Sequence, residues 1–192
     1  MLKCGSMLLA AGKSRRFGQD KRSYLLPGRG PLLISTIKIY QEVFDEVTVV
    51  LAANEFEIAE TLCIGSSNKT LKCVFAKDAH LGMGHSLAAG IESVVDWNYA
   101  FIGLGDMPFI SKTTLMTLKN KAGEDNIVVP TKDGRLGHPV GFPRTHFNEL
   151  QTLRGDNGAR QILENYKKSL TKIETDDVGI FSDIDRIEDI IK

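Results

Sequence analysis

Short apolar runs recur along this chain, and they restrict its fold more than any other feature of the sequence. Several of the runs are apolar at consecutive rather than alternate positions. That pattern is typical of strands that are covered on both faces, as in a parallel sheet. The expected strands are residues 6–10, 47–52, 72–76, 100–104 and 127–130, with a later one at 138–142.

Segments with apolar residues at helical spacing lie between these runs. They are residues 32–43, 55–62, 86–95 and 111–121, and Ser111 is a suitable N-cap for the last of them. Strands and helices in strict alternation predict a mostly parallel sheet with helices on both faces. We therefore expect an α/β fold with three α/β/α layers, of the Rossmann-like kind.

The last third of the sequence departs from this alternation. Residues 134–142 read as a turn and a strand, 157–166 as a helix, 180–183 as a late strand, and 188–191 as a closing segment. A late excursion of this kind predicts an antiparallel strand within the otherwise parallel sheet. No repeat, low-complexity tract or linker interrupts the chain, so residues 1–192 are expected to form a single domain.

Composition excludes several classes of function. The 192 residues are 42% hydrophobic and 25% charged with a formal net charge of zero, so no overall field attracts nucleic acid or a membrane surface. Three scattered cysteines, Cys4, Cys63 and Cys73, form neither a zinc pattern nor a disulfide framework. No run approaches the ~20 apolar residues of a membrane span, and the short apolar start lacks signal-peptide features. A cytoplasmic protein is expected.

The loop after the first expected strand has the strongest chemical signature. Ala10, Ala11 and Gly12 are small, so their N–H groups can approach a phosphate or a base closely. Arg16 and Lys21 follow and can neutralise a triphosphate. The segment is not a P-loop, because position 7 is methionine where that motif needs glycine. A solvated basic loop is the alternative interpretation.

Three further groups follow expected strands, where ligands bind in doubly wound sheets. Gly82 and Ser86 precede a helix, which suits an anion or a close ligand, or else a simple turn. Asp106 follows the strand 100–104, where a Mg²⁺ ligand for a nucleotide would lie, and a capping role is the alternative. Asp183 and Asp185 follow the late strand and form a second acidic group. Carboxylates from these two distant strands, the one before Asp106 and the late one, could share one Mg²⁺.

These motifs together resemble the MobA-like NTP transferase family, and in particular its molybdenum cofactor cytidylyltransferase (MocA-like) branch. The resemblance spans nearly the whole chain. The matching blocks, in order, are Leu9-Ala10-Ala11-Gly12-x-Ser14-x-Arg16-Phe17-Gly18-x-x-Lys21, Gly82-Met83-Gly84-x-Ser86-Leu87, Gly105-Asp106-Met107-Pro108, Gly137-His138-Pro139-Val140, Gly155-Asp156-x-Gly158-Ala159-Arg160 and Asp183-Ile184-Asp185.

The resemblance implies a role for each block. CTP would be the donor, because Ala-Ala-Gly after the first strand goes with cytidylyl transfer and Ala-Gly-Gly with guanylyl transfer. The acceptor would be molybdopterin, a pterin with a terminal phosphate, and a molybdoenzyme or its chaperone would be the protein partner. The implied donor-site residues are Leu9, Ala10, Ala11, Gly12, Ser14, Arg16, Lys21, Gly82, Ser86 and Asp106. Asp106 and Asp185 would hold Mg²⁺, and His138, Asp156 and Arg160 would line the acceptor pocket.

Two departures from the family keep alternatives open. Arg186 and Ile187 replace the usual Thr-Pro after Asp185, and Arg22-Ser23-Tyr24 precedes the usual apolar run after Lys21. The segment Gln19-Asp20-Lys21 is similar to the guanylyl branch. One alternative is therefore a guanylyl, sugar-phosphate or polyol-phosphate nucleotidyltransferase of the same fold. Another is a nucleotide-binding cofactor carrier without turnover.

Overall fold

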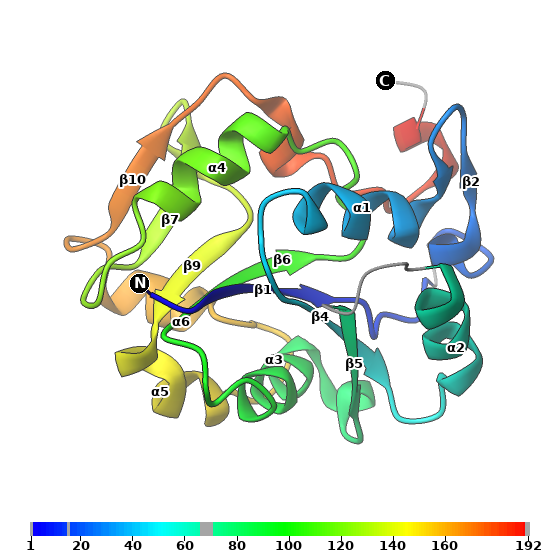
Figure 1. The fold of residues 1–192 in the computed structure, drawn as a ribbon, viewed down its shortest axis with the longest axis horizontal. Helices are drawn as coiled ribbons and strands as arrows, with labels where there is room; N and C mark the ends of the chain where they lie inside the picture. The colour runs from blue at the N-terminus through cyan, green and yellow to red at the C-terminus, as the bar shows by residue number, and fades with distance from the viewer. Residues whose placement is uncertain (1, 15, 66–70, 191–192) are drawn as a thin grey trace.

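The computed structural model describes residues 2–14, 16–65 and 71–190, and a twisted sheet runs through its centre (Figure 1). In this described part, eight strands form the sheet in the order β10-β7-β9-β6-β1-β4-β5, with β8 paired to β7. The strands are β1 Cys4–Leu9, β4 Val47–Ala52, β5 Leu71–Ala76, β6 Tyr99–Leu104, β7 Val128–Lys132, β8 Arg135–Leu136, β9 Val140–Pro143 and β10 Thr171–Glu174. A separate two-stranded ribbon pairs β2 Leu25–Leu26 with β3 Gly30–Pro31.

Strand directions confirm a mostly parallel sheet. β1 is parallel to β4 and β6, β4 is parallel to β5, and β10 is parallel to β7. β9 lies between β6 and β7 and is antiparallel to both. The expected late antiparallel strand is thus confirmed. The carboxyl ends of β1, β4, β5, β6 and β7 all meet at one edge of the sheet.

Helices cover both faces, which confirms the three layers (Figure 1). Side chains of α1, α2 and α4 belong to one buried cluster, and side chains of α3, α5 and α6 belong to the other. The helices are α1 Leu32–Gln41, α2 Phe56–Gly65, α3 Met83–Glu92, α4 Lys112–Asn120, α5 Phe147–Gln151 and α6 Arg160–Asn165.

Strand β1 shows why consecutive positions are apolar. Met7 packs into the cluster under α3, whereas the next residue, Leu8, packs into the cluster under α1, and both side chains are fully buried. Neighbouring side chains of a strand point to opposite faces, so a strand covered on both sides needs apolar residues at every position. The close packing extends to Gly90 of α3, where an added Cβ would lie 2.4 Å from the Met7 sulfur.

Several expected elements differ at their ends or in kind. Helix α3 begins at Met83 with Gly82 as its N-cap, three residues before the expected start. Helix α4 begins after Ser111, whose hydroxyl accepts from the Thr114 N–H at 3.1 Å as expected of an N-cap. The expected helix 157–166 is shorter and spans only α6.

The prediction of a late strand at 180–183 is wrong. The chain forms a 3₁₀ turn over Val178–Phe181 instead, because the Asp177 carboxylate accepts from the Gly179 N–H at 2.9 Å and bends the chain. Asp183 and Asp185 therefore follow a turn and not a strand. Strand β10 was not expected from the sequence, because its alternating exposed and half-buried residues lack an apolar run.

The described residues contain no helix that is both long and apolar enough to cross a membrane. Cys4 is buried in the core, and burial raises the pKa of its thiol to about 12. The Cys63 side chain lies outside the part of the chain whose side chains are described.

Candidate active site

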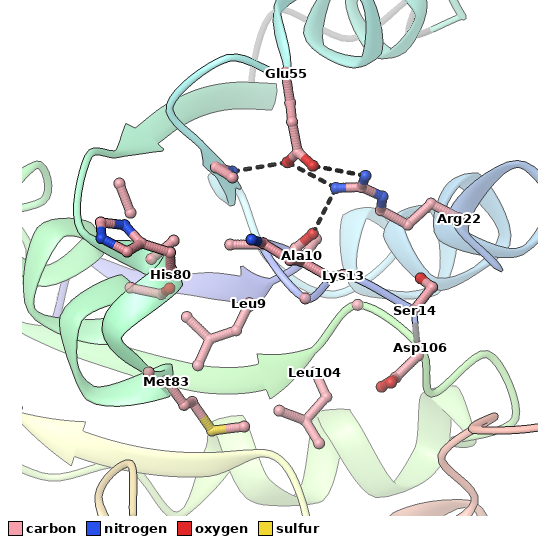
Figure 2. A pocket seen from close by; sticks show the side chains of 18 of the residues that line it. Leu9, Ala10, Lys13, Ser14, Arg22, Glu55, His80, Met83, Leu104 and Asp106 are labelled. Atoms are coloured by element: carbon pink, nitrogen blue, oxygen red, sulfur yellow. Dashed lines mark hydrogen bonds and ion pairs between the residues drawn. The ribbon is translucent and has the colours of Figure 1, made fainter. Parts of the chain in front are cut away.

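An open cleft of about 900 Å³ lies at the carboxyl edge of the sheet, where the ends of the parallel strands meet. Its walls come from segments that follow β1, β4, β5 and β6 and from the chain after the 3₁₀ turn (Figure 2). Of the residues expected at the site, Leu9, Ala10, Ala11, Gly12, Ser14, Arg16, Lys21, Gly82, Ser86, Asp106, Asp156 and Asp185 line this cleft.

Lys21 is the centre of a charged cluster on one wall of the cleft. Its ammonium group lies 2.6 Å from Asp106 Oδ2, 3.2 Å from Asp185 Oδ1 and 2.7 Å from the Ile184 carbonyl oxygen. The side chain is only 13% exposed, and burial lowers the pKa of Lys21, but the two carboxylates outweigh burial and raise it overall. Lys21 is therefore a fixed positive charge that holds two distant carboxylates together.

Arg16 extends this cluster toward solvent. Its Nη1 lies 2.5 Å from Asp185 Oδ2, and the side chain is 71% exposed. Burial raises the pKa of Asp185, but Lys21 and Arg16 lower it overall. The Asp189 carboxylate accepts from the N–H groups of Asp185 and Arg186 at 3.0 and 2.8 Å, which fixes the loop that presents Asp185.

The acidic residues of this wall fit a hard divalent cation. The Oδ1 atom of Asp106 is buried and has no hydrogen-bond partner among the described residues, so one carboxylate oxygen is left for a ligand. Burial raises the pKa of Asp183, and the nearby charges of Asp106 and Asp185 raise it further. Within the described residues no three His, Cys, Asp or Glu side chains form a ready-made cage. Mg²⁺ suits such a site, because it is usually held by one or two carboxylates, substrate phosphates and water.

The opposite wall contains an ion pair that the sequence analysis missed. Arg22 donates to Glu55 through both terminal nitrogens, each at 2.7 Å, and to the Ala10 carbonyl oxygen at 2.9 Å (Figure 2). Glu55 also accepts from the Ala52 N–H at 2.7 Å. Two signals were available in the sequence: Glu55 follows a strand, and Arg22 departs from the family pattern.

Backbone geometry brings the two glycine-containing blocks together at the mouth of the cleft. Gly82 has φ +127°, and an added Cβ there would lie 2.4 Å from the Gly155 backbone and 2.6 Å from Asp156 Oδ1. The Gly84 N–H donates to the Gly155 carbonyl oxygen at 2.7 Å. Only glycine permits this approach at position 82, so it places Asp156 beside the start of α3.

His138 and Arg160 are not among the residues that line the cleft in the described structure. The Nδ1 atom of His138 is buried with no partner among the described residues, and burial lowers its pKa more than the charge of Asp106 raises it. Arg160 points to solvent, is 80% exposed and pairs with Glu164 of its own helix at 3.1 Å. Their expected contacts with an acceptor therefore stay predictions.

Proteins of similar sequence carry several names. The purine catabolism protein PucB of Bacillus subtilis (strain 168) is 30% identical, over 95% of this chain and 92% of PucB. Nicotine blue oxidoreductase of Paenarthrobacter nicotinovorans is 28% identical, over 97% and 94% of the two chains. A probable molybdenum cofactor guanylyltransferase of Natranaerobius thermophilus is 30% identical, over 84% and 74%.

Solved structures agree with this similarity. Rv0371c of Mycobacterium tuberculosis H37Rv has a TM-score of 0.82 and 26% identity, over 98% of this chain and 95% of that one. Rv0371c in complex with manganese has a TM-score of 0.74 and 21% identity, over 91% and 88%. The second likeness describes the fold alone.

The α/β fold, the small-residue loop after β1 and the relatives define an enzyme of the nucleotidyltransferase class. The model of the MobA-like NTP transferase domain matches residues 6–170, and the chain belongs to that family. The resemblance to its MocA-like branch is confirmed by these relatives.

Proposed function

We propose that residues 1–192 act as one Mg²⁺-dependent domain that transfers CMP from CTP to the phosphate of molybdopterin and releases pyrophosphate. The observation that carries the proposal is the pairing of Lys21 with both Asp106 and Asp185, opposite a loop of small residues. One cleft thus combines cations for a triphosphate, carboxylates for a metal and open backbone for a nucleoside.

The reaction needs no nucleophile from the protein. A phosphate oxygen of the acceptor attacks the α-phosphorus of CTP, and the bond to the β-phosphate oxygen breaks. The electron pair of that bond leaves with pyrophosphate, and CMP becomes joined to the acceptor through a phosphoanhydride. The chain would contribute mainly by positioning and by charge neutralisation, as in other phosphoryl transfers.

Each wall has a proposed task. Lys21 and Arg16 would neutralise the triphosphate, and Leu9 to Gly12, Ser14, Gly82 and Ser86 would contact the nucleoside and its phosphates. Asp106 and Asp185 would hold Mg²⁺, which neutralises phosphate oxygens when bound. Rv0371c, which is 26% identical to this chain, has also been solved in complex with manganese, and this favours a divalent ion as the cofactor.

Separate observations support the proposed acceptor contacts and the proposed choice of base. Asp156 lines the cleft beside Gly82 and is the best placed of the three expected acceptor residues. The Ala10-Ala11-Gly12 loop favours CTP. GTP is a second candidate, because a probable molybdenum cofactor guanylyltransferase is 30% identical to this chain. The reaction and its molybdoenzyme or chaperone partner are proposed to be cytoplasmic.

Thermal unfolding with Mg²⁺ and each of CTP, GTP, ATP and UTP tests the donor. Saturation at 100 times the Kd stabilises a protein by about 2.7 kcal/mol, which raises the Tm by roughly 5–10 °C for a domain of this size. We expect this shift with CTP. A shift with GTP alone would reassign the donor, and no shift with any nucleotide at millimolar concentration would contradict the proposed function.

A further inference from the structure

Two neighbouring cations of one 3₁₀ turn, Lys21–Ser23, reach opposite walls of the cleft. Lys21 extends to the acidic wall, where it meets Asp106 and Asp185. Arg22 extends to the other wall, where it meets Glu55 and the Ala10 carbonyl oxygen (Figure 2). The two side chains are equally buried, at 13% exposure. They differ in their partners. Lys21 binds two carboxylates, and Asp106 keeps its Oδ1 without a partner in the described structure, whereas Arg22 binds two carboxylates that are both fully engaged and a backbone carbonyl oxygen.

Arg22 leaves no donor for a ligand. A guanidinium group carries five N–H donors, and all of them are used by groups of the protein. Nε and Nη2 donate to the two oxygens of Asp20 at 2.8 Å each. Nη1 and Nη2 donate to the two oxygens of Glu55 at 2.7 Å each, and Nη1 donates to the Ala10 oxygen at 2.9 Å. Although Arg22 lines the cleft, its geometry does not suit a phosphate.

The contact with Ala10 determines how the loop of residues 10–12 presents its backbone. The carbonyl and the following N–H of a trans peptide point in opposite directions. Since Arg22 holds the Ala10 carbonyl, the Ala11 N–H faces away from Arg22. Ala11 lines the cleft, and no acceptor for its N–H is recorded in the described part of the chain. That N–H group is therefore free to donate to a ligand.

Glu55 connects Arg22 to a second strand. By accepting from the Ala52 N–H, it ties the end of β4 to Arg22, which in turn holds the residue after β1. β1 and β4 are adjacent strands, so the pair spans the wall formed by residues 10–12 and 52–55. A bidentate pair of this kind is geometrically more exact than a single contact.

We propose that Arg22 and Glu55 are a positioning pair that orients the Ala11 N–H toward the donor nucleoside and thereby sets base selectivity, without binding the triphosphate. The proposal rests on the proposed function, because it places the nucleoside of the donor against this wall. Lys21 and Arg16, in contrast, are expected to contact phosphate.

Calorimetric titration of R22M, R22K and E55Q with CTP, GTP and inorganic triphosphate, each with Mg²⁺, tests the pair. Loss of one well-oriented backbone hydrogen bond corresponds to about 3- to 10-fold weaker binding. We expect that loss for CTP in R22M and E55Q, a smaller preference for CTP over GTP, and unchanged affinity for triphosphate. R22K keeps the charge but not the fork, so it is expected to resemble R22M. D20N removes the charge of the more exposed partner but keeps an oxygen that can accept from the Arg22 backbone N–H, so it is the matched control and should change less.

Kinetics and additivity add two readouts. KM for CTP should rise in R22M while kcat stays nearly constant. The double variant R22M/E55Q should bind CTP no more weakly than either single variant, because both substitutions break the same ion pair. Equal weakening of CTP and triphosphate, or unchanged base preference in variants that stay folded, would overturn the positioning role. If the wild-type protein binds triphosphate but no nucleotide, the proposed function fails, and this inference fails with it.

Discussion

The two walls of the cleft use the same kinds of side chain in different ways. On the wall formed by residues 10–12 and 52–55, the donors of Arg22 are all used by Asp20, Glu55 and the Ala10 carbonyl, so its charge stabilises the fold of the loop. On the acidic wall, Asp106 keeps a buried oxygen without a partner in the described structure, and Arg16 is largely exposed. The charged side chains of the first wall are paired with one another and leave only backbone for a ligand, whereas the second wall keeps a carboxylate oxygen and an exposed guanidinium group.

A dense basic segment therefore need not have a single function. Residues 13–29 hold six of the 24 lysines and arginines of the chain. Adjacent members of this set, Lys21 and Arg22, pair with different carboxylates, and we propose that the first serves the ligand site and the second positions the loop. Both side chains have every N–H donor occupied, so charge and donor count do not separate them, but their partners do. Lys21 binds Asp106 and Asp185, the proposed metal ligands, whereas Arg22 binds groups that fix the loop.

The largest effect is expected at the acidic wall, from Asp106→Ala. Asp106 is one of the two proposed Mg²⁺ ligands, and the metal contributes several kcal/mol of charge stabilisation in the transition state, so its loss should abolish measurable turnover. The fold should survive, because Asp106 lies at the end of β6 and outside the hydrophobic clusters. Pyrophosphate release and circular dichroism measure the two properties, and normal turnover in Mg²⁺ would show that Asp106 does not hold the metal.

Lys21→Met should separate metal binding from phosphate binding. In the protein without ligands, Lys21 neutralises Asp106 and Asp185. Its removal should tighten Mn²⁺ binding in the absence of nucleotide, by about tenfold for each 1.4 kcal/mol of lost repulsion, while triphosphate binding weakens. Mn²⁺ titration followed by electron paramagnetic resonance measures the first effect. Weaker Mn²⁺ binding in this variant would contradict the arrangement.

Arg16→Ala should have a smaller effect that falls on phosphate alone. A hydrogen bond from a charged group contributes about 1.5–3 kcal/mol, so pyrophosphate release should slow by roughly 10- to 100-fold. The preference for CTP over GTP should stay, in contrast to Arg22→Met. Equal use of CTP and GTP by Arg16→Ala would erase the distinction between the two walls.

The smallest effect is expected from Asp177→Asn, outside the cleft. Asp177 accepts from the Ser111 N–H, the Thr114 hydroxyl and the Gly179 N–H at 2.7 to 2.9 Å. Burial raises the pKa of Asp177, but these hydrogen bonds lower it overall, so its carboxylate stabilises the fold above the ordinary aspartate pKa of about 4. The variant should lose about 2 kcal/mol of unfolding free energy at pH 7.

That deficit should shrink as the pH falls through the lowered pKa of Asp177, because the wild-type carboxyl then becomes neutral as well. Urea unfolding of the wild-type protein and the variant at pH 7 and at pH 3 measures this difference in unfolding free energy. A deficit of the same size at both values would show that the charge of Asp177 is not what stabilises the turn.

Much of the fold was predictable, because two-sided burial leaves a direct trace in the sequence. The consecutive apolar residues of β1 and β4 indicated their strands to within two residues. β10 was missed because it is an edge strand with polar residues at alternate positions. The turn at Val178–Phe181 was mistaken for a strand because the capping contact of Asp177 is not visible in a short apolar run.

The candidate site was predictable where a residue follows a strand. Ala10, Lys21 and Asp106 were expected from their positions, and the structure brings them into one cleft. The Arg22–Glu55 pair was not expected, since its partners are 33 residues apart and no local pattern links them. Arg160 was assigned by resemblance to a family motif, but in this chain its own helix supplies the partner, Glu164.

Cytidylyl transfer to molybdopterin can be measured as pyrophosphate release from CTP and from GTP, each with Mg²⁺ and molybdopterin. We expect one pyrophosphate for each molybdopterin consumed, with CTP as the better donor and no release when the acceptor is left out. Faster release with GTP would contradict the cytidylyl assignment. No release with either nucleotide, from a protein that binds both molybdopterin and Mg²⁺, would contradict nucleotidyl transfer to this acceptor.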